Sequence, residues 1–187
     1  MDKTRKMPSK YKPLLYTTTI RNPERYKDFM HVLLKYNGVV LNDQSVESIE
    51  KDLFRVGLYR PMSQCASIKN KWKSADKGDV ALYALTDEET DYLYKNNPQK
   101  HKEAGFPEGW LSRFDTQFKL MKILGFVFYG LGQKIEFSDA GRILANSVSI
   151  IIEGEIIKKE IINPHQERLA FLNAFLVIRE ATPSFGS

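Results

Sequence analysis

The strongest constraint in this sequence is a regular spacing of large apolar side chains that ends at a glycine. The spaced residues are Trp110, Phe114, Phe118, Met121 and Leu124. Intervals of four, four, three and three residues place all of them on one face of a helix of about four turns. Gly125 follows directly and suits the left-handed conformation that ends many helices.

Two short apolar runs follow this predicted helix and flank a glycine-rich turn. Residues 126–129 (FVFY) and 134–137 (KIEF) predict paired strands. Gly130-Leu131-Gly132 supplies a turn whose glycines tolerate positive φ. Together these runs predict a β-hairpin.

Another helix is predicted after the hairpin. Ser138 or Asp139 is expected to cap it, and its apolar positions are Ala140, Ile143 and Leu144. Helix, hairpin and helix in this order are typical of a winged-helix unit, which we place at about 108–146.

Further elements are predicted on both sides of this unit. Upstream helices are expected at residues 22–38, 45–60, 65–72 and 86–96, the last with a Thr86/Glu89 capping box, and Leu14–Ile20 predicts a short strand or extended arm. Residues 98–108 predict a loop, residues 150–162 a buried helix and residues 167–178 a last helix. The expected fold class is mainly α, with α+β character from the hairpin.

Basic residues are concentrated in the first part of the chain. Residues 1–77 hold 16 Lys and Arg against 8 Asp and Glu, whereas residues 78–187 hold 12 against 15. The net charges are therefore +8 and −3, within a total of +5. Clustered cations gain free energy from counterion release when they contact a polyanion. The asymmetry fits nucleic-acid binding, and it fits a merely solvated basic surface equally well.

Familiar catalytic and cofactor motifs are absent from the sequence. The histidines lie in separate segments and Cys65 is the single cysteine, which argues against a zinc site and against a disulfide framework. There is no Walker-type loop, no G-x-G-x-x-G and no G-x-S-x-G. A single cysteine suits a reducing, cytoplasmic setting. No apolar run reaches the ~20 residues of a membrane-spanning helix, so we expect no membrane contact.

The polar side of the helix at 110–124 carries the main candidates for DNA binding. They are Arg113, Thr116, Gln117, Lys119 and Lys122, which we expect to project away from the core. Side chains of these types read base edges and hold phosphates. Further candidates from the basic part of the chain are Arg21, Arg25, Lys69, Lys71 and Lys73. The alternative interpretation is a solvated amphipathic helix without a ligand.

Two regions of the chain carry a resemblance to a known family. Residues 17–25 read TTTIRNPER and are followed by Tyr36-Asn37-Gly38, and residues 112–146 contain SRF, KILGFV and IEFSDAGRILAN. These stretches resemble the N-terminal and recognition regions of AlwI-type type II restriction endonucleases, a group that also contains nicking enzymes. The layout is more distantly similar to the recognition domain of FokI-like type IIS enzymes.

The resemblance implies sequence-specific recognition of duplex DNA in a restriction-modification system. Cleavage would belong to a separate nuclease domain or subunit that uses Mg²⁺, because the PD-(D/E)xK carboxylates of that chemistry cannot be placed on this chain. We therefore expect a basic leader at 1–13, a DNA-recognition domain at 14–178, an irregular tail at 179–187 and no cofactor in the chain itself. Such a chain would be a truncated form that lacks the nuclease domain. We expect the loss of that domain to leave Phe171 and Phe175 exposed.

Two alternatives remain open. A free-standing winged-helix transcriptional regulator would need a dimerisation element, which the segments at 150–178 could supply. A small enzyme would need a metal site outside the familiar motifs, and Asp76, Asp79, Asp87 and Glu89 could converge to form one. Metal-dependent cleavage of plasmid DNA distinguishes this enzyme from the two DNA-binding proteins.

Overall fold

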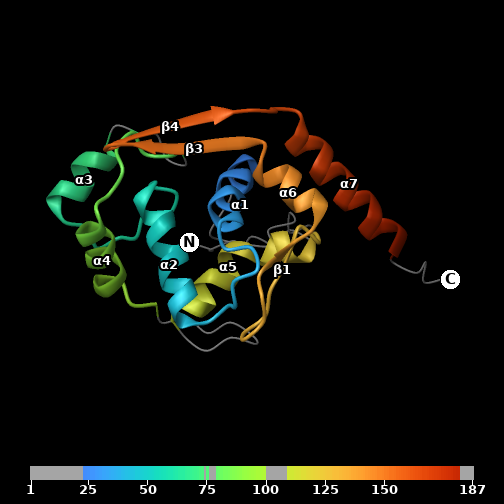
Figure 1. Ribbon diagram of the computed structural model, residues 1–187, viewed down its shortest axis with the longest axis horizontal. Coiled ribbons are helices and arrows are strands. Elements are labelled where there is room, and N and C mark those ends of the chain that lie inside the picture. The colour runs from blue at the N-terminus through green and yellow to red at the C-terminus, as the bar shows by residue number, and fades with distance from the viewer. Residues whose placement is uncertain (1–22, 74, 76–78, 100–108, 182–187) are drawn as a thin grey trace, which may run out of the picture.

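The computed structural model describes residues 23–73, 75, 79–99 and 109–181 (Figure 1). Its elements, in chain order, are the short 3-10 turn η1 (Pro23–Arg25), α1 (Tyr26–Leu34), α2 (Asp43–Arg55), α3 (Ala66–Trp72), α4 (Asp87–Asn96), α5 (Trp110–Ile123), β1 (Val127–Phe128), β2 (Glu136–Phe137), α6 (Asp139–Ala145), β3 (Val148–Glu153), β4 (Ile156–Ile161) and α7 (Gln166–Ala181). Helices and two small antiparallel hairpins make up the fold, so the expected α+β class is confirmed. Leu14–Ile20 and residues 100–108 of the expected loop lie outside the described residues.

Local sequence signals fix where two of the helices begin. The Glu89 amide donates to Thr86 Oγ1 (3.3 Å) and the Thr86 amide donates to Glu89 Oε2 (3.0 Å), which is the capping box predicted for α4. The same reciprocal pattern joins Asn42 and Ser45. Because Asn42 is the cap, α2 begins at Asp43, slightly before the predicted start.

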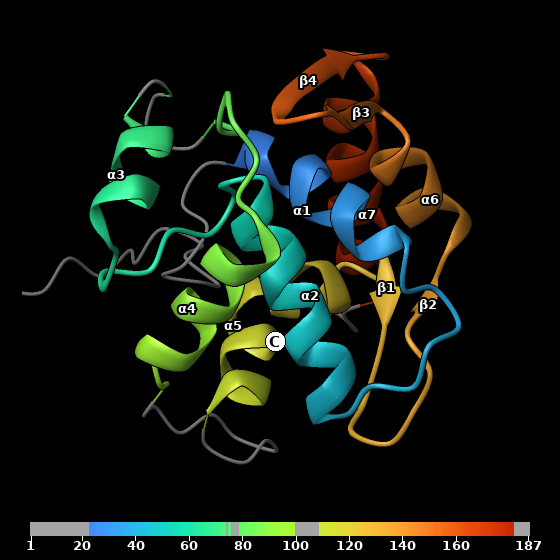
Figure 2. The ribbon, with the colours of Figure 1, turned by 60° about the vertical axis from the view of Figure 1, so that its left-hand side comes forward.

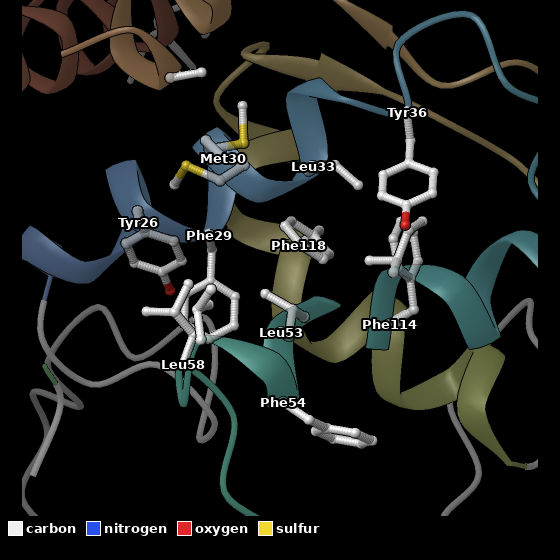
Figure 3. Close-up of a cluster of buried hydrophobic side chains, with 14 of the residues drawn as sticks. Tyr26, Phe29, Met30, Leu33, Tyr36, Leu53, Phe54, Leu58, Phe114 and Phe118 are labelled. Carbon is white, nitrogen blue, oxygen red and sulfur yellow. The ribbon is translucent and has the colours of Figure 1, made fainter. Parts of the chain in front are cut away.

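The hydrophobic core lies where α1, α2 and α5 meet (Figure 3). Phe29 of α1 and Phe118 of α5 pack edge to face with ring centroids 6.1 Å apart, and Phe114 lies 4.8 Å from Phe118. These three rings and Leu53 of α2 are fully buried. The predicted apolar face of α5 is therefore the face that packs into the core, although Trp110 at its start is only half-buried.

The β1–β2 hairpin follows α5 as predicted, and the link between α1 and α2 pairs with it. The Gly38 amide donates to the Ile135 carbonyl (2.7 Å), and the Ile135 amide donates to the Val39 carbonyl (2.9 Å). The second arm of the hairpin therefore lies between β1 and residues 38–41. This pairing joins two parts of the chain that are far apart in sequence.

Residues 150–162 form most of a second hairpin, so the helix predicted there is wrong. β3 and β4 pair antiparallel, with Val148 opposite Ile161. Gly154, with a φ of +64°, opens the tight turn between them. Isoleucine dominates both strands, and β-branched side chains favour an extended backbone over a helix. The apolar run alone did not distinguish the two, because its length fits either structure.

The helix predicted after the first hairpin is α6, and one glycine lets it lie close to β1. Ser138 caps α6, with its Oγ accepting from the Gly141 amide at 3.1 Å. A side chain at Gly141 would collide with the backbone just before β1. Of its three apolar positions, Leu144 is buried, whereas Ala140 and Ile143 are exposed.

α7 packs along α6 at the end of the molecule opposite α3 (Figure 1). Phe171 of α7 contacts Tyr26 (6.2 Å between ring centroids) and Phe126 (5.7 Å). Phe171 is thus half-buried, and the expectation that it is left exposed is wrong; the side chain of Phe175 lies outside the described part of the chain. Within the described residues, no helix combines the length and the apolar character needed to cross a bilayer.

Candidate nucleic-acid interface

α5 positions most of the candidate DNA-binding residues. α2 packs on its buried side, and β1 also contacts it. Its other side carries Arg113, Thr116, Lys119 and Lys122, which are half-buried or exposed. The structure thus brings four of the five residues predicted on this helix to the outside.

Gln117 is the exception, and the expectation that it projects away from the core is wrong. Its side chain is fully buried, and its Nε2 donates to Oε2 of Glu50 on α2 at 3.2 Å. The spacing explains this position, because Gln117 stands three residues after Phe114 and four before Met121, on the apolar face. Burial raises the pKa of Glu50 to about 8, despite the opposing effects of the Gln117 hydrogen bond and the Arg113 charge. Gln117 therefore belongs to the packing of α5 against α2.

Two polar side chains in the first half of α5 are held by their neighbours. Arg113 Nε donates to Gln99 Oε1 at 2.8 Å, and its guanidinium carbon lies 5.6 Å from the centroid of the Tyr59 ring. Thr116 Oγ1 donates to the carbonyl oxygen of Ser112 at 2.9 Å. Because these side chains are already oriented, they lose less conformational freedom when they contact a ligand.

α5 is joined to the first arm of the hairpin by a polar cluster around Asp115. Lys119 Nζ lies 3.7 Å from Asp115 Oδ2, and the Tyr129 hydroxyl donates to Asp115 Oδ1 at 3.1 Å. Burial and the Asp115 carboxylate raise the pKa of the Tyr129 hydroxyl, which keeps this donor protonated. Lys122 Nζ lies 4.6 Å from the centroid of the Tyr129 ring. The helix and the hairpin are therefore fixed relative to each other.

The hairpin exposes residues that the sequence analysis did not select. Leu131 at the turn is 52% exposed, and Lys134 on the returning arm is also exposed. The sequence signal for Leu131 is its place between the two glycines of the predicted turn, where a side chain is exposed at the tip of the hairpin. We call the combined site the α5–hairpin surface, defined by Arg113, Thr116, Lys119, Lys122 and Lys134.

The other predicted cations do not join this surface. α3, which carries Lys69 and Lys71 and is followed directly by Lys73, lies on the opposite side of the molecule from the β1–β2 hairpin in the view of Figure 2. Lys71 pairs with Glu89 at 2.8 Å, whereas Lys69 and Lys73 are exposed. Any contact that α3 makes with DNA would therefore be separate from that of the hairpin.

The side chain of Arg25 contacts other parts of the fold. Its Nη2 donates to the Leu58 carbonyl at 2.6 Å, and its guanidinium carbon lies 5.4 Å from the centroid of the Phe29 ring. Burial lowers the pKa of Arg25, and the charges of Asp28 and Asp79 offset this effect only in part. Arg21 lies outside the described residues.

Within the described ranges, no three His, Cys, Asp or Glu side chains are arranged to hold a metal ion. Two of the carboxylates considered for an enzyme site have cationic partners, since Asp87 pairs with Arg55 and Glu89 with Lys71. Asp79 is exposed, and Asp76 is not among the residues that the structure describes.

Comparisons of the chain with protein-family models, with curated proteins and with solved structures gave no match.

Proposed function

We propose that this chain recognises duplex DNA, with α5 in the major groove and the β1–β2 hairpin as the wing of a winged-helix unit. One observation carries the proposal: residues 38–41, between α1 and α2, are hydrogen-bonded to the second arm of the hairpin that follows α5. The resulting order of helix, strand, helix, helix and two strands matches that of a winged-helix unit, which would then span residues 26–137 and not the 108–146 expected from the sequence. α3 and α4 are then an insertion before the helix that enters the groove.

The chemistry of the α5–hairpin surface supports the same role. It comprises the cations Arg113, Lys119, Lys122 and Lys134 and the hydroxyl of Thr116, all half-buried or exposed. Lysine and arginine contact phosphates and the acceptor edge of guanine, and a threonine hydroxyl contacts several base edges. Because Asp115 and Tyr129 fix the hairpin against α5, both elements would meet the duplex as one rigid unit.

We further propose that recognition serves a restriction-modification system. The support is the resemblance of residues 17–38 and 112–146 to AlwI-type restriction endonucleases. Phosphodiester cleavage would then be carried out by a separate Mg²⁺-dependent nuclease domain or subunit. Selection from a random duplex library tests this step: enrichment of one defined sequence supports it, and retention of all sequences alike contradicts it.

DNA binding itself is tested by titrating a fluorescent duplex with the purified chain at about 50 and 200 mM salt. We expect affinity to fall steeply with salt, and Lys119→Ala and Lys122→Ala each to lower the salt slope by about 1. Lys95→Ala, which removes an exposed cation on α4, is the matched control and should leave the slope unchanged. A flat salt response, or an equal loss in the control, would contradict the proposal.

A further inference from the structure

The turn of the β1–β2 hairpin carries a large apolar residue. Leu131 stands between Gly130 and Gly132, and its side chain is 52% exposed. In both views this turn lies at the lower edge of the molecule (Figures 1 and 2). Glycine, proline, asparagine, aspartate and serine dominate turns, each for a conformational reason that leucine does not share.

The conformation of the turn does not require Leu131. The Gln133 amide donates to the Gly130 carbonyl at 2.9 Å, which closes a four-residue turn with Leu131 and Gly132 at its centre. Gly132 has a φ of +74°, the conformation that a type II turn needs at its third position, so glycine is favoured there. The second position has no such need for leucine. Leu131 is therefore available for a contact outside the chain.

The turn is supported by a segment that is distant in sequence. The Gly132 amide donates to the Leu41 carbonyl at 2.9 Å, and the Leu41 amide donates to the Gln133 carbonyl at 2.8 Å. The first arm of the same hairpin is fixed to α5, because the Tyr129 hydroxyl donates to Asp115. An exposed side chain on such a support meets a ligand with little ordering of the backbone beneath it.

The shape and charge of the turn suit the minor groove of DNA. The glycines on both sides of Leu131 carry no side chain, so the tip is narrow, and the minor groove is only about 6 Å wide. Residues 129–135 contain no acidic residue, and their one charged side chain, Lys134, is exposed. An apolar tip with a cation beside it can enter a groove that is bordered by phosphates.

We propose that Leu131 inserts between two base pairs from the minor groove and unstacks them, so that this protein kinks the duplex it binds. The inference rests on the proposed function, and Lys134 would contact a phosphate beside the kinked step. Apolar wedges of this kind bend the duplex toward the major groove. Pyrimidine–purine steps are kinked most easily, so Leu131 would add a preference for such a step to the base contacts of α5.

The test is relaxation of a closed circular plasmid by topoisomerase I in the presence of the chain. A wedge unwinds the duplex locally, so the plasmid should keep a lowered linking number after the protein is removed. Leu131→Ala should lose this shift. Leu131→Lys, with a cation in place of the wedge, should bind a fluorescent duplex about as tightly as wild type and still not shift the linking number. Leu172→Ala, which shortens a 56% exposed leucine on α7, is the matched control and should keep the shift.

Three outcomes would overturn the inference, and they separate it from the proposed function. A wild-type chain that binds the fluorescent duplex without changing the linking number has no wedge, although it still binds DNA. A full shift with Leu131→Ala would place the unwinding elsewhere in the chain. Absence of duplex binding would refute both proposals and favour a protein as the partner of Leu131. Thermal melts by circular dichroism establish that each variant is folded.

Discussion

Gln117 of α5 donates a hydrogen bond from Nε2 to Oε2 of Glu50 on α2 across 3.2 Å, and both side chains are fully buried. The remaining oxygens, Glu50 Oε1 and Gln117 Oε1, have no hydrogen-bond partner among the described residues. A carboxyl group in such a place is far less destabilising when it is neutral. This agrees with the pKa of about 8 that burial gives Glu50. The packing of α5 on α2 is therefore sensitive to pH.

Glu50→Gln should remove most of this pH dependence. The carboxyl has a pKa of about 4.5 in the unfolded chain and about 8 in the folded one, so the wild-type free energy of unfolding falls as pH rises through this window. One proton limits the slope to about 1.4 kcal/mol per pH unit. Urea unfolding at several pH values should show a flatter profile for the variant. Glu47→Gln, on the same helix but 42% exposed, should keep the wild-type slope, and parallel profiles for Glu50→Gln and wild type would refute the assignment.

Gln117→Ala should lower the stability of the fold, whereas Arg113→Ala should lower the affinity for DNA. Removing Gln117 deprives the buried Glu50 of its donor, so we expect a loss of about 1–3 kcal/mol in stability with little change in DNA affinity. Removing Arg113 should cost about 1–3 kcal/mol of specific binding while the melting temperature stays close to wild type. Thermal melts and duplex titrations on the two variants measure both quantities. The reverse result would place Gln117, and not Arg113, in the contact with DNA.

Gly141→Ala should destabilise the fold although it adds a single methyl group. A Cβ at this position would lie 1.9 Å from the carbonyl oxygen of Phe126, so α6 would have to move away from β1. Overpacking of this kind typically costs about 1–3 kcal/mol. Urea unfolding measures the loss. Ala140→Ser, at the exposed neighbouring position, is the control and should unfold at the wild-type midpoint. An unchanged midpoint for Gly141→Ala would show that the fold accommodates the added methyl group, and would contradict this prediction.

His31→Ala should loosen the β3–β4 hairpin. His31 Nδ1 lies 3.1 Å from the Ala145 carbonyl, and the Ile150 amide donates to its Nε2 at 3.3 Å. A neutral ring with its proton on Nδ1 satisfies both contacts, and their loss should cost about 1–3 kcal/mol. Amide hydrogen exchange should show faster exchange at Ile150 and along β3. His165→Ala, at an exposed site, is the control, and equal exchange in the two variants would argue against the bridge.

The helices were predictable because their signals are local. The Thr86/Glu89 capping box and the apolar spacing of α5 depend on residues only a few positions apart. The hairpin at 148–161 was missed because a run of isoleucines suits a buried helix as well as a strand, and its pairing partners are set by register. Burial of Gln117 could have been read from its spacing to Phe114 and Met121, but its polarity outweighed that signal.

The features of the fold and of the candidate site that the sequence could not predict depend on contacts between segments far apart in the chain. Nothing in residues 38–41 indicates that they pair with the second arm of the β1–β2 hairpin. The separation of α3 from the β1–β2 hairpin is likewise a property of the assembled fold (Figure 2). The groove lined by Ile123, Ile143 and Leu169 also arises only when α5, α6 and α7 meet.

The pairing of residues 38–41 with residues 133–135 also governs when this protein can fold during its synthesis. The first segment leaves the ribosome long before the second has been translated, so its backbone groups stay with water until the hairpin emerges. The apolar faces of α1 and α2 also stay uncovered until α5 has been translated, because α5 supplies the rings that cover them. A nascent chain paused before α5 therefore presents an open edge and an uncovered apolar surface, the features that chaperones bind and that lead to aggregation.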